Sequence, residues 1–227
     1  MKILLVDDEE SLLNLVKINL MFENYEVITA ECGKAAIELF QTQSPDLVVL
    51  DLMLPDIDGF QVIHAIQEIN NEVPIIVLSA KNQINDRLLG LQLGADDYVT
   101  KPFDSRELIL RIRAISRRIN KAKLLNNKKQ SSIIEKGFIK IMKDERRVFI
   151  DSKEVIFTHI EFEILVLMVK NSYKVFTREE LLDKIWGYDF SGNTRAVDIH
   201  IKRIRKKLLE HEDAIKTIYG VGYRFEV

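Results

Sequence analysis

Polar groups that can do chemistry stand at the ends of four apolar segments in the first half of the chain. In chain order these groups are Asp7 with Asp8, Asp51, Ser79 and Lys101. The apolar segments are short, as are strands buried on both faces of a parallel sheet. Open sheets of this kind bind ligands at the carboxyl ends of their strands. We therefore expect the acids, the hydroxyl and the ammonium group at one edge of a sheet.

Asp7, Asp8 and Asp51 would place three carboxylates close together. Like charges at short range resist ionising together unless a cation neutralises them. Mg²⁺ suits this role, because it takes oxygen ligands, binds through one or two carboxylates and keeps several waters. A carboxylate nucleophile with Mg²⁺, a hydroxyl and an ammonium group forms a set suited to phosphoryl transfer.

The elements that must position these groups alternate along the first half. Strands are expected near 2–7, 25–30, 46–51, 74–79 and 97–100. Helical patterns are expected near 10–21, 33–42, 59–69, 84–92 and 104–119. Such alternation indicates βαβ units and a parallel sheet covered on both faces. Five units predict a flavodoxin-like, doubly wound α/β domain with strand order 2-1-3-4-5.

Residues 120–132 separate two halves that differ in charge. This stretch is polar and basic without sustained periodicity, so we expect a linker between domains over 1–119 and 133–227. Residues 1–120 carry 11 Lys and Arg against 19 Asp and Glu, whereas residues 121–227 carry 22 against 16. This asymmetry indicates different partners for the two halves, and the basic half is the candidate for nucleic acid.

The second half begins with short alternating strands between residues 139 and 157. Two capping boxes then start helices, with Thr158 before Glu161 and Thr177 before Glu180. The chain ends in a long helix over 194–210 and a hairpin over 215–225. Together these elements predict an α+β winged helix-turn-helix.

The composition fits a cytoplasmic protein without a membrane partner. No apolar run approaches the roughly 18 residues that a bilayer crossing needs. The first expected strand begins at residue 2, which leaves no room for a signal peptide. Cys32 is the only cysteine, so no intrachain disulfide can form and a reducing compartment fits.

The acids, hydroxyl and lysine at the strand ends resemble, in type and order, the motif of response-regulator receiver domains of bacterial two-component signalling. The resemblance implies that Asp51 accepts a phosphoryl group from a sensor histidine kinase. Asp8, Asp51 and the backbone carbonyl of Met53 would hold Mg²⁺, and Asp7 would act through a bound water. Lys101 would pair with Asp51 and, after phosphorylation, with a phosphate oxygen.

The same resemblance implies a switch. Ser79 would move toward the phosphoryl group, and Tyr98 would swing inward into the space that it leaves. The physical content is a two-state element biased by added charge on one side chain. The Lys101-Pro102 bond is expected to be cis, a form essentially confined to X-Pro bonds.

The whole chain resembles transcriptional response regulators of the OmpR/PhoB type. The resemblance implies a homodimer through the receiver domain that binds tandem half-sites on double-stranded DNA. Relatives form salt bridges across this dimer. The paired positions fall here on Arg87 with Glu107, Asp97 with Arg111, and Asp96 with Arg113.

One side of the last long helix is an apolar stripe that should face the core, made of Val197, Ile201, Ile204 and Leu208. The opposite side is expected to enter the major groove. There Arg203 is expected to read guanine, and Ile199 to touch a thymine methyl group. Arg195, His200 and Lys202 are expected to hold phosphates.

The segment 218–225 closely resembles the wing of this family, with one departure. Relatives often carry an arginine that enters the minor groove where this chain has Tyr219. Tyr219 is a candidate DNA contact without that cation. The loop over 187–193 lies where relatives contact RNA polymerase, which is therefore an expected partner.

Enzymatic alternatives lack their motifs. A phosphatase of the haloacid dehalogenase type needs an Asp two residues after the nucleophile, where this chain has Met53. The sequence contains no G-x-x-x-x-G-K-[ST] of a P-loop nucleotidase. We expect a regulator rather than a dedicated enzyme. The alternative is a DNA-binding regulator whose receiver-like domain only dimerises, and the complete acid set argues against it.

Overall fold

The computed structural model describes most of the chain, namely residues 1–80, 94–125, 133–187 and 194–227. The described residues form two compact units, Met1–Ile112 and Arg113–Val227. The division falls within helix α5 (Ser105–Leu125). Residues 120–125 of the predicted linker continue this helix, and the linker over 120–132 stays a prediction.

The first unit contains a five-stranded parallel sheet with the order β2-β1-β3-β4-β5. Its strands are β1 (Lys2–Val6), β2 (Glu26–Ala30), β3 (Leu47–Asp51), β4 (Ile75–Ser79) and β5 (Asp97–Thr100). Every residue of β3 and β4 is buried, as continuous apolar runs predict for central parallel strands. The doubly wound α/β fold expected from the sequence is confirmed.

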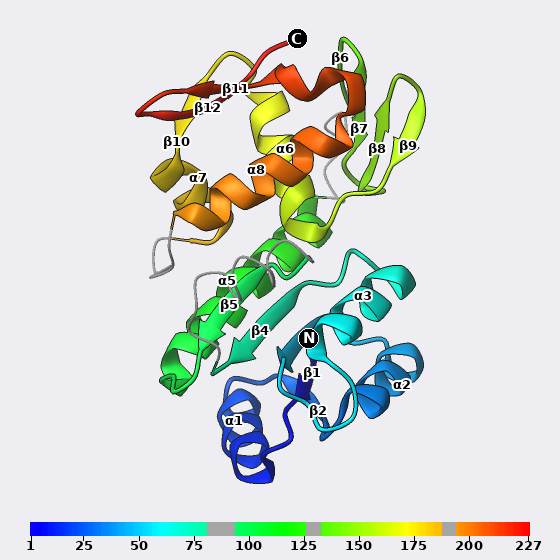
Figure 1. Cartoon of the computed structure of the whole chain (residues 1–227), viewed down its shortest axis with the longest axis vertical. Helices are drawn as coiled ribbons and strands as arrows, with labels where there is room; N and C mark the ends of the chain where they lie inside the picture. The colour runs from blue at the N-terminus through cyan, green and yellow to red at the C-terminus, as the bar shows by residue number, and fades with distance from the viewer. Residues whose placement is uncertain (81–93, 126–132, 188–193) are drawn as a thin grey trace. The chain divides into compact units, whose positions relative to one another are not determined.

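Helices cover both faces of this sheet. Figure 1 shows α2 (Gly33–Gln43) and α3 (Gly59–Ile69) on one side, with α1 (Glu10–Phe22) and α5 on the other. Alternate strand residues supply the core beneath α2 and α3, among them Leu4, Val6, Val48, Leu50, Ile75 and Val77. Because successive side chains of a strand point to opposite faces, one sheet serves two cores. The predicted helix over 84–92 lies outside the described residues.

The second unit contains two antiparallel sheets. The four-stranded sheet has the order β6-β7-β8-β9, formed by β6 (Ile133–Lys136), β7 (Ile139–Met142), β8 (Arg147–Ile150) and β9 (Lys153–Val155). The three-stranded sheet has the order β10-β12-β11, formed by β10 (Val175–Thr177), β11 (Ile215–Ile218) and β12 (Gly222–Phe225). The sequence did not predict β6 and β10.

Three helices pack with these sheets: α6 (His159–Lys170), α7 (Arg178–Ile185) and α8 (Arg195–Lys207). At the start of α6, the carboxylate of Glu161 accepts the backbone N–H of Thr158 at 2.9 Å. At the start of α7, the hydroxyl of Thr177 accepts the backbone N–H of Glu180 at 3.0 Å. Both helices therefore begin where the capping boxes predict.

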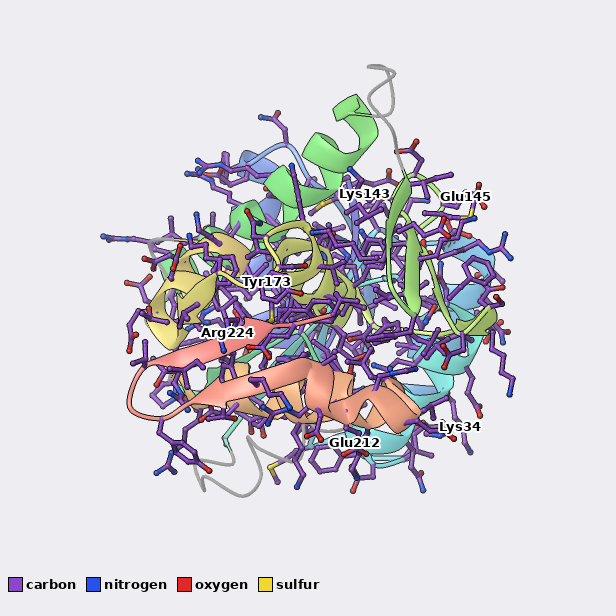
Figure 2. The ribbon with its side chains drawn as sticks, turned by 90° about the horizontal axis from the view of Figure 1, so that it is seen from above. Lys34, Lys143, Glu145, Tyr173, Glu212 and Arg224 are labelled. Carbon is purple, nitrogen blue, oxygen red and sulfur yellow. The ribbon has the colours of Figure 1, made fainter. Side chains whose placement is uncertain are left out.

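A 3₁₀ helix, Leu209–Ala214, joins α8 to the terminal hairpin, so α8 ends earlier than predicted. Tyr173, labelled in Figure 2, forms hydrogen bonds with the C-terminal residues. Its backbone N–H donates to the carbonyl of Phe225 at 2.8 Å, and its hydroxyl donates to the carbonyl of Val227 at 2.7 Å. None of the described helices has the length and apolarity that would let it cross a membrane.

Candidate functional site

Three carboxylates from two strand ends meet at one edge of the parallel sheet. Because β1 and β3 are neighbours, Asp7 and Asp8, which follow β1, lie beside Asp51 at the end of β3. One oxygen of each carboxylate lies within 4.8 Å of the others. Asp7 and Asp51 are buried, whereas Asp8 is exposed and keeps one side of the cluster open.

Lys101 brings a cation to this cluster from the end of β5. Its Nζ lies 2.5 Å from Asp51 Oδ2 and 2.6 Å from Asp7 Oδ2. Its backbone N–H donates to the carbonyl of Ser79 at 2.9 Å, and the Lys101-Pro102 bond is cis, as predicted. Burial alone would lower the pKa of Lys101, but hydrogen bonds to the two carboxylates raise it overall. Burial raises the pKa of Asp7, and the bond from Lys101 only partly opposes this.

Backbone groups orient the same carboxylates. Asp51 Oδ1 accepts the N–H of Met53 at 3.0 Å, and Asp7 Oδ1 accepts the N–H of Glu9 at 3.1 Å. The first bond fixes the start of the loop after β3, in which Met53 is the expected carbonyl ligand. The donor set is oxygen only and partly open. Such a set fits Mg²⁺, which prefers oxygen ligands and keeps several waters.

Two loop residues that the sequence did not single out support this loop. Asp56 accepts the N–H groups of Gly33 and Lys34, at 2.8 and 2.9 Å, and so joins the loop to the start of α2. These bonds, that of Lys34 first, lower the pKa of Asp56 to about 2. A Cβ on Gly59 would lie 2.5 Å from the Cα of Leu52, so only glycine fits this contact. For Gly59, the pair Asp58-Gly59 at the start of α3 was the available signal.

Ser79 and Tyr98 lie on the neighbouring strands β4 and β5. Ser79 ends β4 and is fully buried. Tyr98 is 4 % exposed and belongs to the core beneath α2 and α3. The coupling of the two residues as a switch stays a prediction.

Asp97 and Arg111 pair within the chain, and the predicted interchain salt bridge between them stays a prediction. Arg111 Nη1 donates to both oxygens of Asp97 at 2.8 and 2.7 Å, and its Nη2 lies 2.6 Å from Glu107 Oε1. Arg111 is 8 % exposed and Asp97 5 %. The side chain of Arg111, on α5, thus reaches the start of β5 in its own chain.

The other residues of the expected dimer face differ in their exposure to solvent. Asp96 is 2 % exposed, and its carboxylate accepts the N–H of Ile75 at 2.7 Å. Arg113 is exposed on α5, and its pairing with Asp96 stays a prediction. Arg87 lies outside the described residues.

The apolar stripe of α8 is buried as predicted, with Val197, Ile201, Ile204 and Leu208 all at 0 % exposure. The buried side is wider than the stripe. His200 is also 0 % exposed, and its ring lies 5.6 Å from that of Trp186. Its predicted phosphate contact is therefore wrong. Ile199, at 8 % exposure, has little surface for the predicted thymine contact.

The side chain of Arg203 points toward Glu161 of α6. Its Nε lies 2.6 Å from Glu161 Oε1, and its side chain is only 17 % exposed. The predicted guanine contact is not supported by this position, because Glu161 already holds the guanidinium group. The exposed basic residues of α8 are Arg195, Lys202 and Lys206.

The wing is joined to α8 by a network that includes Asp198. Asp198 Oδ1 accepts bonds from Arg178 Nε at 2.7 Å and from the hydroxyl of Tyr223 at 2.6 Å. Arg205 donates to the carbonyl of Ile215. These contacts fix the hairpin to the helix. At the hairpin turn, Tyr219 is 92 % exposed, while residues 188–193 of the expected polymerase loop lie outside the described part of the chain.

Family models match both halves of the chain. Residues 3–113 match the response regulator receiver domain, and residues 152–225 match the family described as transcriptional regulatory protein, C terminal. The solved structure of DrrB, an OmpR/PhoB homologue from Thermotoga maritima, is 34 % identical, with a TM-score of 0.52 over 100 % of this chain and 99 % of that chain.

Whole-chain relatives agree with these matches. The alkaline phosphatase synthesis transcriptional regulatory protein PhoP of Bacillus subtilis is 41 % identical over 99 % of this chain and 96 % of its own length. The transcriptional regulatory protein SrrA of Staphylococcus aureus is 41 % identical over 100 % of this chain and 95 % of its own length. The protein thus belongs to the two-component transcriptional response regulators of the OmpR/PhoB type, in which a receiver domain is joined to a C-terminal DNA-binding domain.

Proposed function

We propose that Asp51 is the residue that accepts the phosphoryl group in this response regulator. The observation that carries the proposal is the position of Lys101 Nζ, bonded to Asp51 and Asp7 in a cluster that Asp8 leaves open to the outside. The donor is the phosphohistidine of a sensor histidine kinase. A carboxylate oxygen of Asp51 attacks phosphorus, the phosphorus–nitrogen bond breaks, and the electron pair of that bond stays on the imidazole.

Asp8, Asp51 and the carbonyl of Met53 would hold Mg²⁺, with Asp7 acting through a water. The bound cation would neutralise phosphoryl oxygens beside carboxylates that could not otherwise tolerate them. Lys101 then has a second role, because its ammonium group can transfer its bond from Asp51 to a phosphoryl oxygen. Slow hydrolysis of the acyl phosphate would return Asp51 to its carboxylate form.

The phosphoryl group would be sensed by Ser79, whose hydroxyl can donate to a phosphoryl oxygen. Tyr98 would move with it, because both residues lie on adjacent strands at the same sheet edge. The response would be a shift of a two-state equilibrium, driven by about −1.5 to −2 of added charge. The expected consequence is a homodimer through the α5 and β5 face of the receiver domain.

The dimer would bind tandem half-sites on DNA through α8 and the wing. Arg195 and Lys202 are exposed on α8 and are the proposed phosphate contacts, and Tyr219 is the proposed contact of the wing. The loop after Gly187 would reach RNA polymerase. Contacts of these kinds join a phosphorylation signal to transcription without enzymatic turnover of a substrate.

The experiment compares the full-length chain with its Asp51→Asn variant. Each is incubated with a small acyl phosphate and Mg²⁺, weighed intact by mass spectrometry, and then used to select genomic DNA fragments. One added phosphoryl group on the wild type alone, with more fragments retained, supports the proposal. The variant Asp104→Asn, altered at the cap of α5, is the control and should behave as the wild type.

Two results would contradict this proposal. Phosphorylation of Asp51→Asn to the same extent as the wild type would place the acceptor elsewhere. Equal fragment selection by wild type and variant, despite phosphorylation of the wild type, would favour a regulator whose receiver domain does not use phosphorylation.

A further inference from the structure

Glu161, on α6, is a fully buried carboxylate that holds two cations of the recognition helix α8. Its Oε1 lies 2.6 Å from Arg203 Nε, and its Oε2 lies 2.5 Å from Lys207 Nζ. The same Oε2 accepts the N–H of Thr158 at 2.9 Å. The side chain of Glu161 is 0 % exposed, whereas those of Arg203 and Lys207 are 17 and 29 % exposed.

The charges at this position depend on one another. Burial alone would raise the pKa of Glu161, but Arg203 and Lys207 lower it overall, so the carboxylate is ionised. A buried ionised group without a partner is strongly unfavourable, and removing one member of such a pair leaves the other uncompensated. Arg203 and Lys207 are thus retained inside the domain unless Glu161 loses its charge.

These pairs define which side of α8 faces α6. His200, Arg203 and Lys207 are spaced by three and four residues, so they lie on one side of the helix. His200 is fully buried, and neither of its ring nitrogens has a hydrogen-bond partner among the described residues. This side is therefore an interior side, although its sequence is basic.

The exposed basic residues lie on another side of the same helix. Arg195, Lys202 and Lys206 are separated by seven and four residues, which also aligns them along one side. A rotation of α8 about its axis would move both sets away from their present positions. The ion pairs at Glu161 oppose such a rotation, since it would carry Arg203 and Lys207 away from their carboxylate.

We propose that Glu161 is a positioning residue for DNA recognition, which fixes the rotation of α8 through Arg203 and Lys207 and so presents Arg195, Lys202 and Lys206 to DNA. This inference rests on the proposed DNA-binding role of α8. It assigns Arg203 to the interior of the domain, and it assigns sequence selectivity in part to a residue that never touches DNA.

The first test needs no DNA. Urea unfolding of the full chain is followed by the fluorescence of Trp186, the single tryptophan, which lies buried in the second unit. Glu161→Gln and Arg203→Gln should each lower the unfolding midpoint, and the double variant should lose less than the sum of the two. Lys202→Gln, on the exposed side, should leave the midpoint unchanged. Additive losses would overturn the pairing.

The second test measures selectivity. The probes are a duplex selected by the wild-type chain from a random pool and a scrambled duplex of equal composition. Glu161→Gln should reduce the ratio of the two affinities by about tenfold or more, the size of one mismatched base pair. The neutral pair Glu161→Gln with Arg203→Gln should recover part of the ratio.

Matched variants separate the possible results. Lys202→Gln should lower the salt slope by about 0.9 for one lost phosphate contact. A similar drop for Arg203→Gln, with Glu161→Gln behaving as wild type, would place Arg203 on DNA and overturn the proposal. If Glu161→Gln does not fold, Lys207→Gln serves in its place, because it keeps the carboxylate paired with Arg203. Lys207→Gln should reduce the affinity ratio relative to the wild type, and an unchanged ratio would count against the proposal.

Failure of the underlying function gives a different result. If the wild-type chain selects no duplex from the pool, the DNA-binding role is wrong. The unfolding cycle then still decides whether Glu161 couples α6 to α8.

Discussion

Lys101 and Asp51 form an ion pair in which Nζ and Oδ2 are 2.5 Å apart. The same Nζ lies 2.6 Å from Asp7, so one ammonium group contacts two buried carboxylates. The pair joins the end of β5 to the end of β3, two strands that are separated by β4 in the sheet. Any cation that enters the cluster must share these carboxylates with Lys101.

The first prediction concerns that competition. Lys101→Met should tighten Mg²⁺ binding, because it removes a positive charge that repels the metal ion. Two unit positive charges 4 Å apart repel each other by about 1–4 kcal/mol in water or near a protein surface. Isothermal calorimetry with MgCl₂ would measure it on the full chain. Lys34→Met, an exposed lysine of α2 (Figure 2), is the control and should not change the affinity. If Lys101→Met bound Mg²⁺ with the same affinity as the wild type, Lys101 would leave the carboxylates without a cost in free energy when the metal binds.

The second prediction concerns the buried pair of Asp97 and Arg111. Arg111→Met should lower the stability of the receiver unit by about 3–5 kcal/mol, because the buried carboxylate of Asp97 loses its cationic partner. Adding Asp97→Asn should restore much of this loss. Far-UV circular dichroism follows the whole chain, while Trp186 fluorescence reports the second unit separately. Arg113→Met, on the exposed side of α5, should cost far less; equal losses for both arginines would rule out a special role for the pair.

The third prediction concerns pH. Burial, with Arg203 and Lys207 adding to it and Glu161 opposing it, lowers the pKa of His200 from 6.5 to about 4. Above pH 6.5 the ring is neutral in both the folded and the unfolded state. Between pH 6.5 and about 4, His200 binds a proton only in the unfolded chain. The free energy of unfolding should therefore decrease as the pH is lowered through this range, by at most about 1.4 kcal/mol per pH unit.

Urea unfolding at a series of pH values, followed by Trp186 fluorescence, would check this dependence. His200→Phe removes the titrating group and should flatten the curve in that window. The slope of the wild type persisting in His200→Phe would assign the effect to other groups.

The fourth prediction concerns the wing. Tyr219 is 92 % exposed at the hairpin turn and carries no charge that could displace a counterion. Tyr219→Arg should steepen the log–log salt dependence of DNA binding by about one phosphate contact. It should also favour A·T-rich flanks, whose narrow minor groove attracts an inserted cation.

Binding isotherms across a salt series, on sites with A·T-rich and G·C-rich flanks, would measure both effects. Ile156→Arg adds the same charge at an exposed position after β9 and is the control for net charge. If the two arginine variants behave alike, the wing turn does not reach DNA.

Features that depend on short local patterns were predictable. Apolar runs that end in Asp7, Asp51 and Ser79 determined the strands of the parallel sheet, and topology then placed their ends at one edge. The capping residues Thr158 and Thr177 determined where α6 and α7 begin. Strand ends and helix caps depend on a few neighbouring residues, whose effect the sequence shows directly.

The roles of charged residues on α8 and α5 depended on the tertiary structure. The sequence showed a basic side of α8, but it could not show that Glu161, some forty residues earlier, holds Arg203 inside. Nor could it show that Arg111 pairs with Asp97 of its own chain. A long cationic side chain can serve a buried carboxylate or an external partner, and the energy of each pair depends on burial. Burial is a property of the packed chain, so only the fold decides which cations remain for DNA or for a second subunit.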